Sequence, residues 1–215
     1  MINKQERAPL MEALSAFAEQ KPLSFHVPGH KNGQIFHKQG KDLFQRLLRI
    51  DVTEVEGLDD LHAPEGAILE AEQLLSEVYN TQKSYFLVNG TTCGNLAMIL
   101  GNCQEGDIVL VQRNCHKSIL NGLRLAKAKP VFLRNELNEE WEVAEGLSVH
   151  TVKKALERYS GAKALILTYP TYYGVANDIE EIIAVAHEHK VTVLVDEAHG
   201  AHFAAGAPFP KSSLA

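Results

Sequence analysis

The sequence predicts an α/β protein: a three-layer α/β/α arrangement around a mostly parallel sheet, preceded by an irregular N-terminal segment. From about residue 67 onward, short β-branched runs alternate with amphipathic helical stretches. The helical stretches have the length of βαβ crossovers, which connect parallel strands. The stretch Val191–Gly200, VTVLVDEAHG, ends an apolar run in two carboxylates and a histidine. Open sheets of this kind bind ligands at the carboxyl ends of their strands.

The elements follow from periodicity, caps and turn residues. Before residue 67 we expect short helices over 9–20 and 41–49, the segment SFHVPGHKNGQ between them, and an acidic loop over 51–66. Residues 1–66 are therefore expected to form a helical and irregular segment, and residues 67–215 an incomplete α/β domain. Helices are expected over 68–78, 92–101 and 118–127, after the cap Ser148, and after the capping-box pair Asp178 and Glu181. The five expected strands cover 84–88, 107–112, 130–134, 164–168 and 191–195.

The loops that follow parallel strands share one edge of the sheet, so the residues after each strand form one candidate site. A glycine and two hydroxyls at a helix start, Gly90–Thr92, suit a phosphate, although a turn with a threonine cap explains them equally well. His116 lies between a strand and a helix, where a histidine is more often a cap than a catalytic group. Asp196 is the strongest signal, because a carboxylate after four apolar residues needs a partner that offsets its desolvation.

Composition excludes several classes of function. The chain has 21 basic and 27 acidic residues with no dense basic block, which argues against nucleic-acid binding. No apolar run is long enough to span a membrane and the N-terminus lacks a signal-peptide core, so we expect a cytoplasmic protein with no membrane contact. Three cysteines without CxxC spacing indicate reduced thiols and no structural metal site.

Five motifs together resemble the bacterial ornithine/lysine/arginine decarboxylases in their short form. They are FHVPGHKNG at 25–33, LVNGTTCGN at 87–95, RNCHKS at 113–118, LTYPTYYG at 167–174 and VDEAHGAHF at 195–203. The resemblance implies the large domain of the aspartate aminotransferase fold (fold type I) and the cofactor pyridoxal 5′-phosphate. It also implies decarboxylation of arginine, lysine or ornithine to a polyamine precursor, by a homodimer or higher oligomer.

The resemblance assigns a role to each residue that matches a motif of the family. Gly90–Thr92 match the phosphate-binding turn, His116 the histidine that stacks on the cofactor ring, and Asp196 the partner of the pyridine nitrogen. The expected catalytic residues are His116, Asp196 and His199. The expected cofactor-binding residues are Gly90, Thr91, Thr92, His116, Thr168, Asp196, Ala198 and His199.

The sequence departs from the family pattern after Asp196. The family places its Schiff-base lysine in a Ser/Thr-x-His-Lys motif there, whereas this sequence has only Lys211 in PFPKSSLA. We therefore expect an N-terminal fragment of a longer decarboxylase that does not turn over substrate by itself. The resemblance also places the PGHK region and the acidic loop near the substrate. The candidate substrate residues are His30, Lys31, Asp59 and Asp60, although a solvated acidic loop is the more common explanation of such charges.

Three alternatives stay open at this point. An aminotransferase or aldolase of the same fold would share the phosphate turn and the ring aspartate. A DEAH-box NTPase would share the letters DEAH, but the phosphate loop G-x-x-x-x-G-K-[ST] that it requires is missing from the sequence. A metal site made of Asp196, His199 and His202 is a loose match to known ligand sets.

Overall fold

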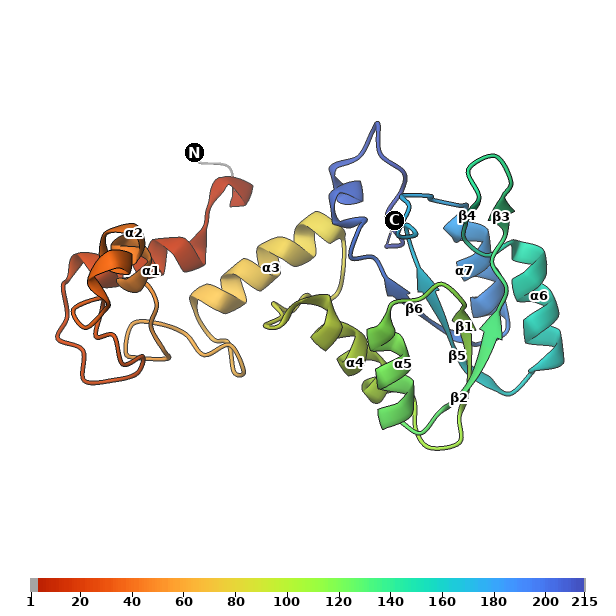
Figure 1. Ribbon diagram of the computed structural model, residues 1–215, viewed down its shortest axis with the longest axis horizontal. Helices are drawn as coiled ribbons and strands as arrows, with labels where there is room; N and C mark the ends of the chain where they lie inside the picture. Colours follow the sequence, from red (N-terminus) through yellow and green to blue (C-terminus); the bar gives the residue numbers. More distant parts are fainter. Residues whose placement is uncertain (1–3, 215) are drawn as a thin grey trace. The chain divides into compact units, whose positions relative to one another are not determined.

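The computed structural model describes residues 4–214, which form two compact units that divide between Phe86 and Leu87 (Figure 1). The division falls one helix later than the boundary expected after residue 66. The reason is that helix α3, Ala67–Tyr79, packs against helix α1, Pro9–Glu19, and so belongs to the first unit. That unit also contains the short 3-10 helix η1, Lys4–Glu6, and helix α2, Lys38–Leu48.

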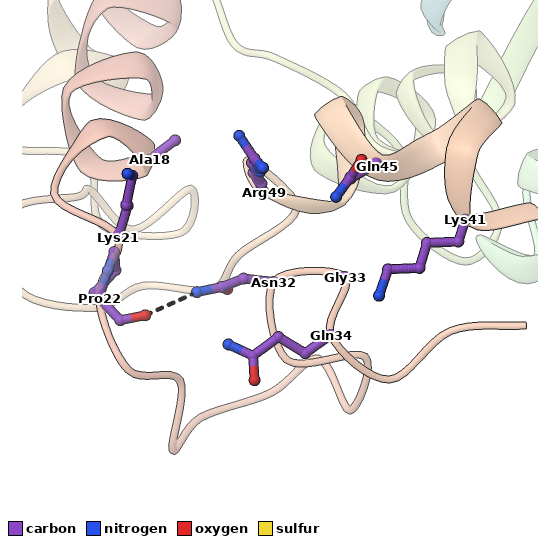
Figure 2. Close-up of a pocket in the computed structure, with 9 residues that line it drawn as sticks. All are labelled: Ala18, Lys21, Pro22, Asn32, Gly33, Gln34, Lys41, Gln45 and Arg49. Atoms are coloured by element: carbon purple, nitrogen blue, oxygen red, sulfur yellow. Dashed lines mark hydrogen bonds between the residues drawn. The ribbon is translucent and has the colours of Figure 1, made fainter. Parts of the chain in front are cut away.

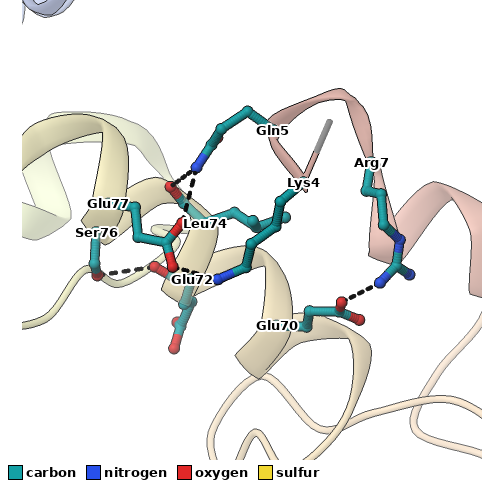
Figure 3. A network of polar contacts seen from close by, with 8 residues as sticks. All are labelled: Lys4, Gln5, Arg7, Glu70, Glu72, Leu74, Ser76 and Glu77. Carbon is teal, nitrogen blue, oxygen red and sulfur yellow. Dashed lines mark hydrogen bonds and ion pairs between the residues drawn. The ribbon is translucent and has the colours of Figure 1, made fainter. Parts of the chain in front are cut away.

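Polar contacts connect the start of the first unit to α3 (Figure 3). Lys4 pairs with Glu77 and Arg7 pairs with Glu70. The amide of Gln5 donates to the backbone oxygen of Leu74 over 3.4 Å. The paired side chains are largely exposed, so these contacts orient the N-terminal segment more than they stabilise it.

The second unit contains a four-stranded, fully parallel sheet in the order β2-β1-β5-β6. Thr168 at the end of β5 lies opposite Asp196 at the end of β6, so these two strands end at the same level. This register places two predicted site residues side by side at the carboxyl edge. The strands are β1, Ile108–Gln112; β2, Lys129–Leu133; β5, Ala162–Thr168; and β6, Thr192–Asp196.

Helices cover both faces of this sheet, as Figure 1 shows. Alternate strand residues point to opposite faces. Val109 and Val111 therefore pack in one core with Ile99, whereas Leu110 packs in the other core with Val152. The predicted three-layer α/β/α arrangement is confirmed. The helices are α4, Gly90–Asn102, and α5, Lys117–Leu125, on the first face, with α6, Val149–Arg158, and α7, Ile179–Glu188, on the second.

The helix caps follow the sequence prediction in part. Ser148 accepts a hydrogen bond from the backbone N–H of Thr151, and Asp178 accepts one from the N–H of Glu180. Glu181, the expected second half of the capping box, instead contacts Lys153 at 3.6 Å. Both helices begin where their caps predict, since capping is decided by a few neighbouring residues.

The predicted strand over 84–88 is wrong. Its aromatic and β-branched composition favours a strand, but the segment is irregular, and Tyr85 and Val88 are more than half exposed. A strand forms only when another strand accepts its backbone hydrogen bonds, and no segment between residues 4 and 214 pairs with this one. The sequence did not predict the 3-10 helices η1 and η2, Ala201–Ala205, or the small hairpin of β3, Leu137–Asn138, with β4, Val143–Ala144. Within the described residues, no helix is long and apolar enough to cross a membrane.

Candidate functional site

A cavity of about 490 Å³ lies at the carboxyl ends of the strands in the second unit. The post-strand segments after β1, β5 and β6 contribute to its wall, together with the first turn of α4. Asn95, Asn114, Cys115, Lys117 and Tyr172 contribute to the wall as well. The structure thus brings together all eight residues expected to bind a cofactor: Gly90, Thr91, Thr92, His116, Thr168, Asp196, Ala198 and His199.

The first turn of α4 lies at the cavity wall and has no side-chain cap within the described residues. Asn89 and Gly90 both have left-handed backbone conformations, with φ of 67° and 68°. The free N–H groups of a first helical turn, together with the helix dipole, attract an anion. The exposed Thr91 and Thr92 add hydroxyl groups at the same end.

Asp196 is a buried carboxylate, 6% exposed, at the end of β6. Its Oδ2 accepts a hydrogen bond of 2.8 Å from Asn95 Nδ2, and its Oδ1 accepts one of 3.3 Å from the backbone N–H of Ala198. Both partners are neutral, and no ion pair in the described part of the chain includes Asp196. A buried carboxylate is stabilised most by a cationic partner, so this group is suited to a positively charged ligand atom.

A chain of polar side chains connects Asp196 to His116. Asn95 Nδ2 also contacts Ser118 Oγ at 2.8 Å, and Ser118 Oγ lies 2.8 Å from His116 Nδ1. Asn95 and Ser118 are both about 2% exposed. The backbone N–H of Ser118 also donates to His116 Nδ1, so we infer that the ring carries its proton on Nε2. The ring itself is exposed toward the cavity and acts as the N-cap of α5.

Sequence reasoning assigned no role to Asn95 or Ser118, although both lie inside quoted motifs. The position of each residue in the sequence was the signal that could have identified it. Asn95 follows Thr91 by four residues and so lies on the same face of α4, one turn further along the helix. Ser118 is two residues after His116, which is the spacing of a local cap.

Gln112, a third residue that sequence reasoning missed, fixes Thr168. Its amide accepts from the backbone N–H of Thr168 over 3.3 Å and donates to the Thr168 carbonyl over 3.2 Å. The side chain of Gln112, 2% exposed, therefore continues the pairing of β1 with β5 by one residue. The hydroxyl of Thr168 is buried beside the cavity without a hydrogen-bond partner in the described chain. An unsatisfied buried hydroxyl at a cavity wall fits a ligand with a polar atom at that place.

Cys115 also lines the cavity. Burial raises the pKa of its thiol, the nearby negative charge of Asp196 raises it further, and these effects outweigh the opposing backbone hydrogen bond and Arg113. The thiol stays protonated at neutral pH, which disfavours a role as nucleophile or metal ligand.

The structure separates the residues of the DEAH sequence. Asp196, Ala198 and His199 line the cavity, whereas Glu197 does not. The Glu197 carboxylate instead accepts hydrogen bonds from Ser212 and from the backbone N–H of Ser213. Glu197 therefore holds the segment near residue 213, and the paired carboxylates that a DEAH-box site requires do not face one ligand.

His199 and His202 have different surroundings. The ring of His199 lies edge-on to Tyr172 with centroids 6.0 Å apart, whereas His202 packs against Phe203 and Phe209. Across residues 4–214, no three His, Cys, Asp or Glu side chains come together as metal ligands.

The four candidate substrate residues lie in the first unit, and their contact with a substrate stays a prediction. His30 contacts Asp51 at 3.1 Å through Nε2 and accepts from the N–H of Gly33 through Nδ1. Lys31 Nζ donates to the backbone oxygen of His26 over 2.5 Å. Both side chains are therefore already engaged within their own loop.

Asp59 has a structural role at the start of α3. Its carboxylate accepts the backbone N–H groups of Glu65, Gly66 and Ile68 at 2.9–3.0 Å. Burial favours the neutral form, but these backbone hydrogen bonds outweigh it and lower the pKa of Asp59 to about 2. Asp60 is less engaged, because within the described chain its carboxylate accepts one backbone N–H, that of His62, over 2.8 Å.

The fold and the site define an α/β protein with a ligand site at the carboxyl edge of a parallel sheet. Comparison with known proteins then gives the family. The family model of the Orn/Lys/Arg decarboxylase major domain matches residues 8–215, and the chain belongs to this family.

Similar proteins agree with the assignment. The chain is 53% identical over 206 residues to an uncharacterized protein of Bacillus subtilis (strain 168), YaaO, covering 96% of this chain and 43% of that protein. It is 37% identical over 211 residues to an arginine decarboxylase of Bacillus anthracis, covering 98% of this chain and 43% of that enzyme. The chain therefore spans less than half the length of these relatives.

A solved structure confirms the fold. The lysine decarboxylase LdcF of Francisella novicida superimposes with a TM-score of 0.76 at 23% sequence identity. The match covers 92% of this chain and 29% of that one. At this level of identity the likeness shows the fold alone, which is the α/β fold type I expected from the sequence.

Proposed function

We propose that this chain forms the cofactor-binding part of a pyridoxal 5′-phosphate-dependent decarboxylase that acts on arginine, lysine or ornithine. The observation that carries the proposal is Asp196. It is a buried carboxylate with neutral partners only, and it lies in the same cavity as an open helix N-terminus. A ligand with a phosphate at one end and a protonated ring nitrogen at the other matches both features.

The residues present fit this cofactor. The first turn of α4, with Thr91 and Thr92, would hold the phosphate through N–H groups and hydroxyls. The exposed ring of His116 would stack on one face of the pyridine, and Ala198 would lie under the other. The buried Thr168 hydroxyl, which lacks a partner among residues 4–214, would donate to a polar atom of the ring.

Asp196 would hold a proton at the pyridine nitrogen, while Asn95 and the N–H of Ala198 keep its carboxylate in place. The bound cofactor supplies an electron-accepting ring for the electrons left on the substrate α-carbon when carbon dioxide departs. His199, which lines the same cavity, would contact the cofactor or the substrate at the open side.

The same proposal includes the expectation that this chain alone does not catalyse decarboxylation. No lysine in the 215 residues matches the Ser/Thr-x-His-Lys motif by which the family attaches its cofactor. We expect this chain to bind the cofactor without turnover. Sustained release of carbon dioxide from arginine, lysine or ornithine by this chain alone would contradict that expectation.

Pyridoxamine 5′-phosphate is the probe for a binding test, because it carries no aldehyde that could react with surface lysines. Calorimetry should show saturable binding of this probe to the chain. Asp196→Asn should weaken binding about tenfold or more, since hydrogen bonds to charged groups contribute roughly 1.5–3 kcal/mol. The matched control is Asp42→Asn, which removes an exposed carboxylate of α2. Equal affinity of both variants would argue against the proposed role of Asp196.

A further inference from the structure

A second cavity, of about 200 Å³, lies entirely within the first unit and plays no part in the proposed function (Figure 2). Three cationic side chains contribute to its wall: Lys21, Lys41 and Arg49. Figure 2 shows Lys21 and Lys41 on opposite sides of the cavity, with Arg49 between them. In the described chain, no carboxylate lines this cavity.

The three cations differ from those lysines and arginines of the described chain that form ion pairs. None of them takes part in an ion pair found between residues 4 and 214, whereas Lys4, Arg7, Lys127, Lys153 and Lys211 each pair with a glutamate. The chain carries a formal net charge of −6, so acidic partners are abundant. Three like charges around one cavity repel each other unless an anion lies between them.

Two of the three cations, Lys41 and Arg49, lie on one wall. Lys41, Gln45 and Arg49 follow each other at intervals of four residues and therefore lie along one side of α2 and its C-cap. Gln45 adds an amide group to this wall, and Gln34 adds one from the 31–34 loop (Figure 2). Ammonium, guanidinium and amide N–H groups are all hydrogen-bond donors, and guanidinium binds phosphate oxygens in a bidentate geometry.

The opposite wall is held in a fixed conformation. Lys31, Asn32 and Gly33 have successive left-handed backbone conformations, with φ of 51°, 54° and 81°. Leu48 of α2 packs so closely on Gly33 that a Cβ added there would lie 3.1 Å from Leu48 Cβ. The Asn32 side chain donates to the backbone oxygen of Pro22 over 3.2 Å, which connects the loop to the end of α1. The cavity is therefore preformed, which lowers the entropic cost of binding a ligand.

From these observations, we propose that the cavity between α1, α2 and the 31–34 loop binds a small phosphate-bearing anion through Lys21, Lys41 and Arg49. Its volume is below that of a site for a drug-sized ligand, which commonly exceeds roughly 300 Å³, and it suits a group of one or two phosphates. The site is distinct from the strand-end cavity, because all of its residues precede residue 50.

The test is calorimetric titration of the full chain with inorganic pyrophosphate, with inorganic phosphate and citrate as comparison anions. The double variant Lys41→Gln/Arg49→Gln should bind pyrophosphate about tenfold more weakly than the parent chain, because two of the three charges are lost. Arg46→Gln, which removes an exposed arginine of the same helix outside the cavity, should bind within about twofold of the parent. Tighter binding of citrate than of pyrophosphate would overturn the assignment to phosphate.

A measurement on the unmodified chain tests the same proposal without variants. Addition of pyrophosphate to ¹⁵N-labelled protein should shift the amide resonances of Gly33 and Gln34. Shifts confined to Gly90–Thr92, no binding at all, or equal weakening in the double variant and in Arg46→Gln would each overturn the proposal. Because the proposed cofactor site is read out separately at Gly90–Thr92, failure of one site is distinguishable from failure of the other.

Discussion

Asp196 shows at the scale of single residues how this fold prepares a site before any ligand binds. Its carboxylate is buried at the end of β6 and oriented by Asn95 and the N–H of Ala198. Asn95 connects it further to Ser118 and, through that hydroxyl, to His116. The two groups proposed to contact the cofactor ring therefore share one buried polar network, and networks of this kind are rigid when every member has a partner.

Asn95→Ala tests the network through stability. The change removes the donor to a buried carboxylate, so we expect the free energy of unfolding to fall by roughly 1.5–3 kcal/mol in urea denaturation. The control Asn102→Ala, on the same helix but exposed, should change it by less than about 0.5 kcal/mol. Equal losses in the two variants would show that Asn95 has no special role.

The eight residues that the family resemblance assigned to the cofactor all line one cavity. For those that follow β1, β5 and β6, the strand ends expected from periodicity already indicated this location. No role was predicted for Asn95, Ser118 or Gln112. Their importance comes from contacts with residues 23, 56 and 101 positions away. A short sequence motif does not show which residues this far apart in the chain come into contact.

Among the secondary-structure elements, α3 depends on a residue outside the helix. Asp59 accepts N–H groups at the N-terminus of α3, which a capping residue next to the helix would otherwise accept. The negative charge also lies at the positive end of the helix dipole. A residue predicted to attract substrate thus has a demonstrable structural function.

We expect Asp59→Asn to lower the free energy of unfolding by about 1 kcal/mol at neutral pH, the usual scale of a lost helix cap. The folded-state pKa of Asp59 is about 2, below its ordinary value of 3.8. Its contribution is therefore complete above about pH 4 and is lost as the pH falls through 2. Thermal melts of both proteins should converge over this range. A constant difference down to pH 2 would contradict the assignment.

Asp60→Asn is the matched control and also tests the substrate prediction. Because the Asp60 carboxylate accepts a single backbone N–H among the described residues, its loss should change stability less than the loss of Asp59. In an active full-length relative, a raised KM for the diamino acid with little change in kcat would support substrate attraction by Asp60. An unchanged KM would remove Asp60 from the substrate site.

The secondary-structure elements also show which features neighbouring residues can predict and which they cannot. Helices that begin at Ser148 and Asp178 were predicted correctly, since a cap and its helix are neighbours in sequence. The stretch 84–88 was predicted as a strand and is irregular, because pairing needs a second strand that composition does not reveal.

At the scale of the whole molecule, the strand-end cavity belongs to one of the two units. All residues that line it, and both apolar cores of the sheet, lie between residues 87 and 214. The chain spans less than half the length of relatives such as the Bacillus anthracis arginine decarboxylase. Oligomeric state, cellular location and substrate choice of the whole protein therefore stay predictions.

The location of the cavity leads to a prediction about the isolated second unit. Residues 87–215, expressed alone, should bind pyridoxamine 5′-phosphate within about threefold of the full chain, because no lining residue is removed. Calorimetry on both proteins measures this, with circular dichroism to confirm folding. Folded but non-binding protein would mean that the first unit contributes to the site.

The most direct test of the account is the protonation state of the ligand ring. The ¹⁵N chemical shift of pyridoxamine 5′-phosphate, labelled at the ring nitrogen, would be measured on the chain at a pH above the ring pKa in solution. The account predicts a protonated nitrogen when the ligand is bound to the parent chain and an unprotonated one in Asp196→Asn. A bound ligand with an unprotonated ring nitrogen in the parent chain would contradict it.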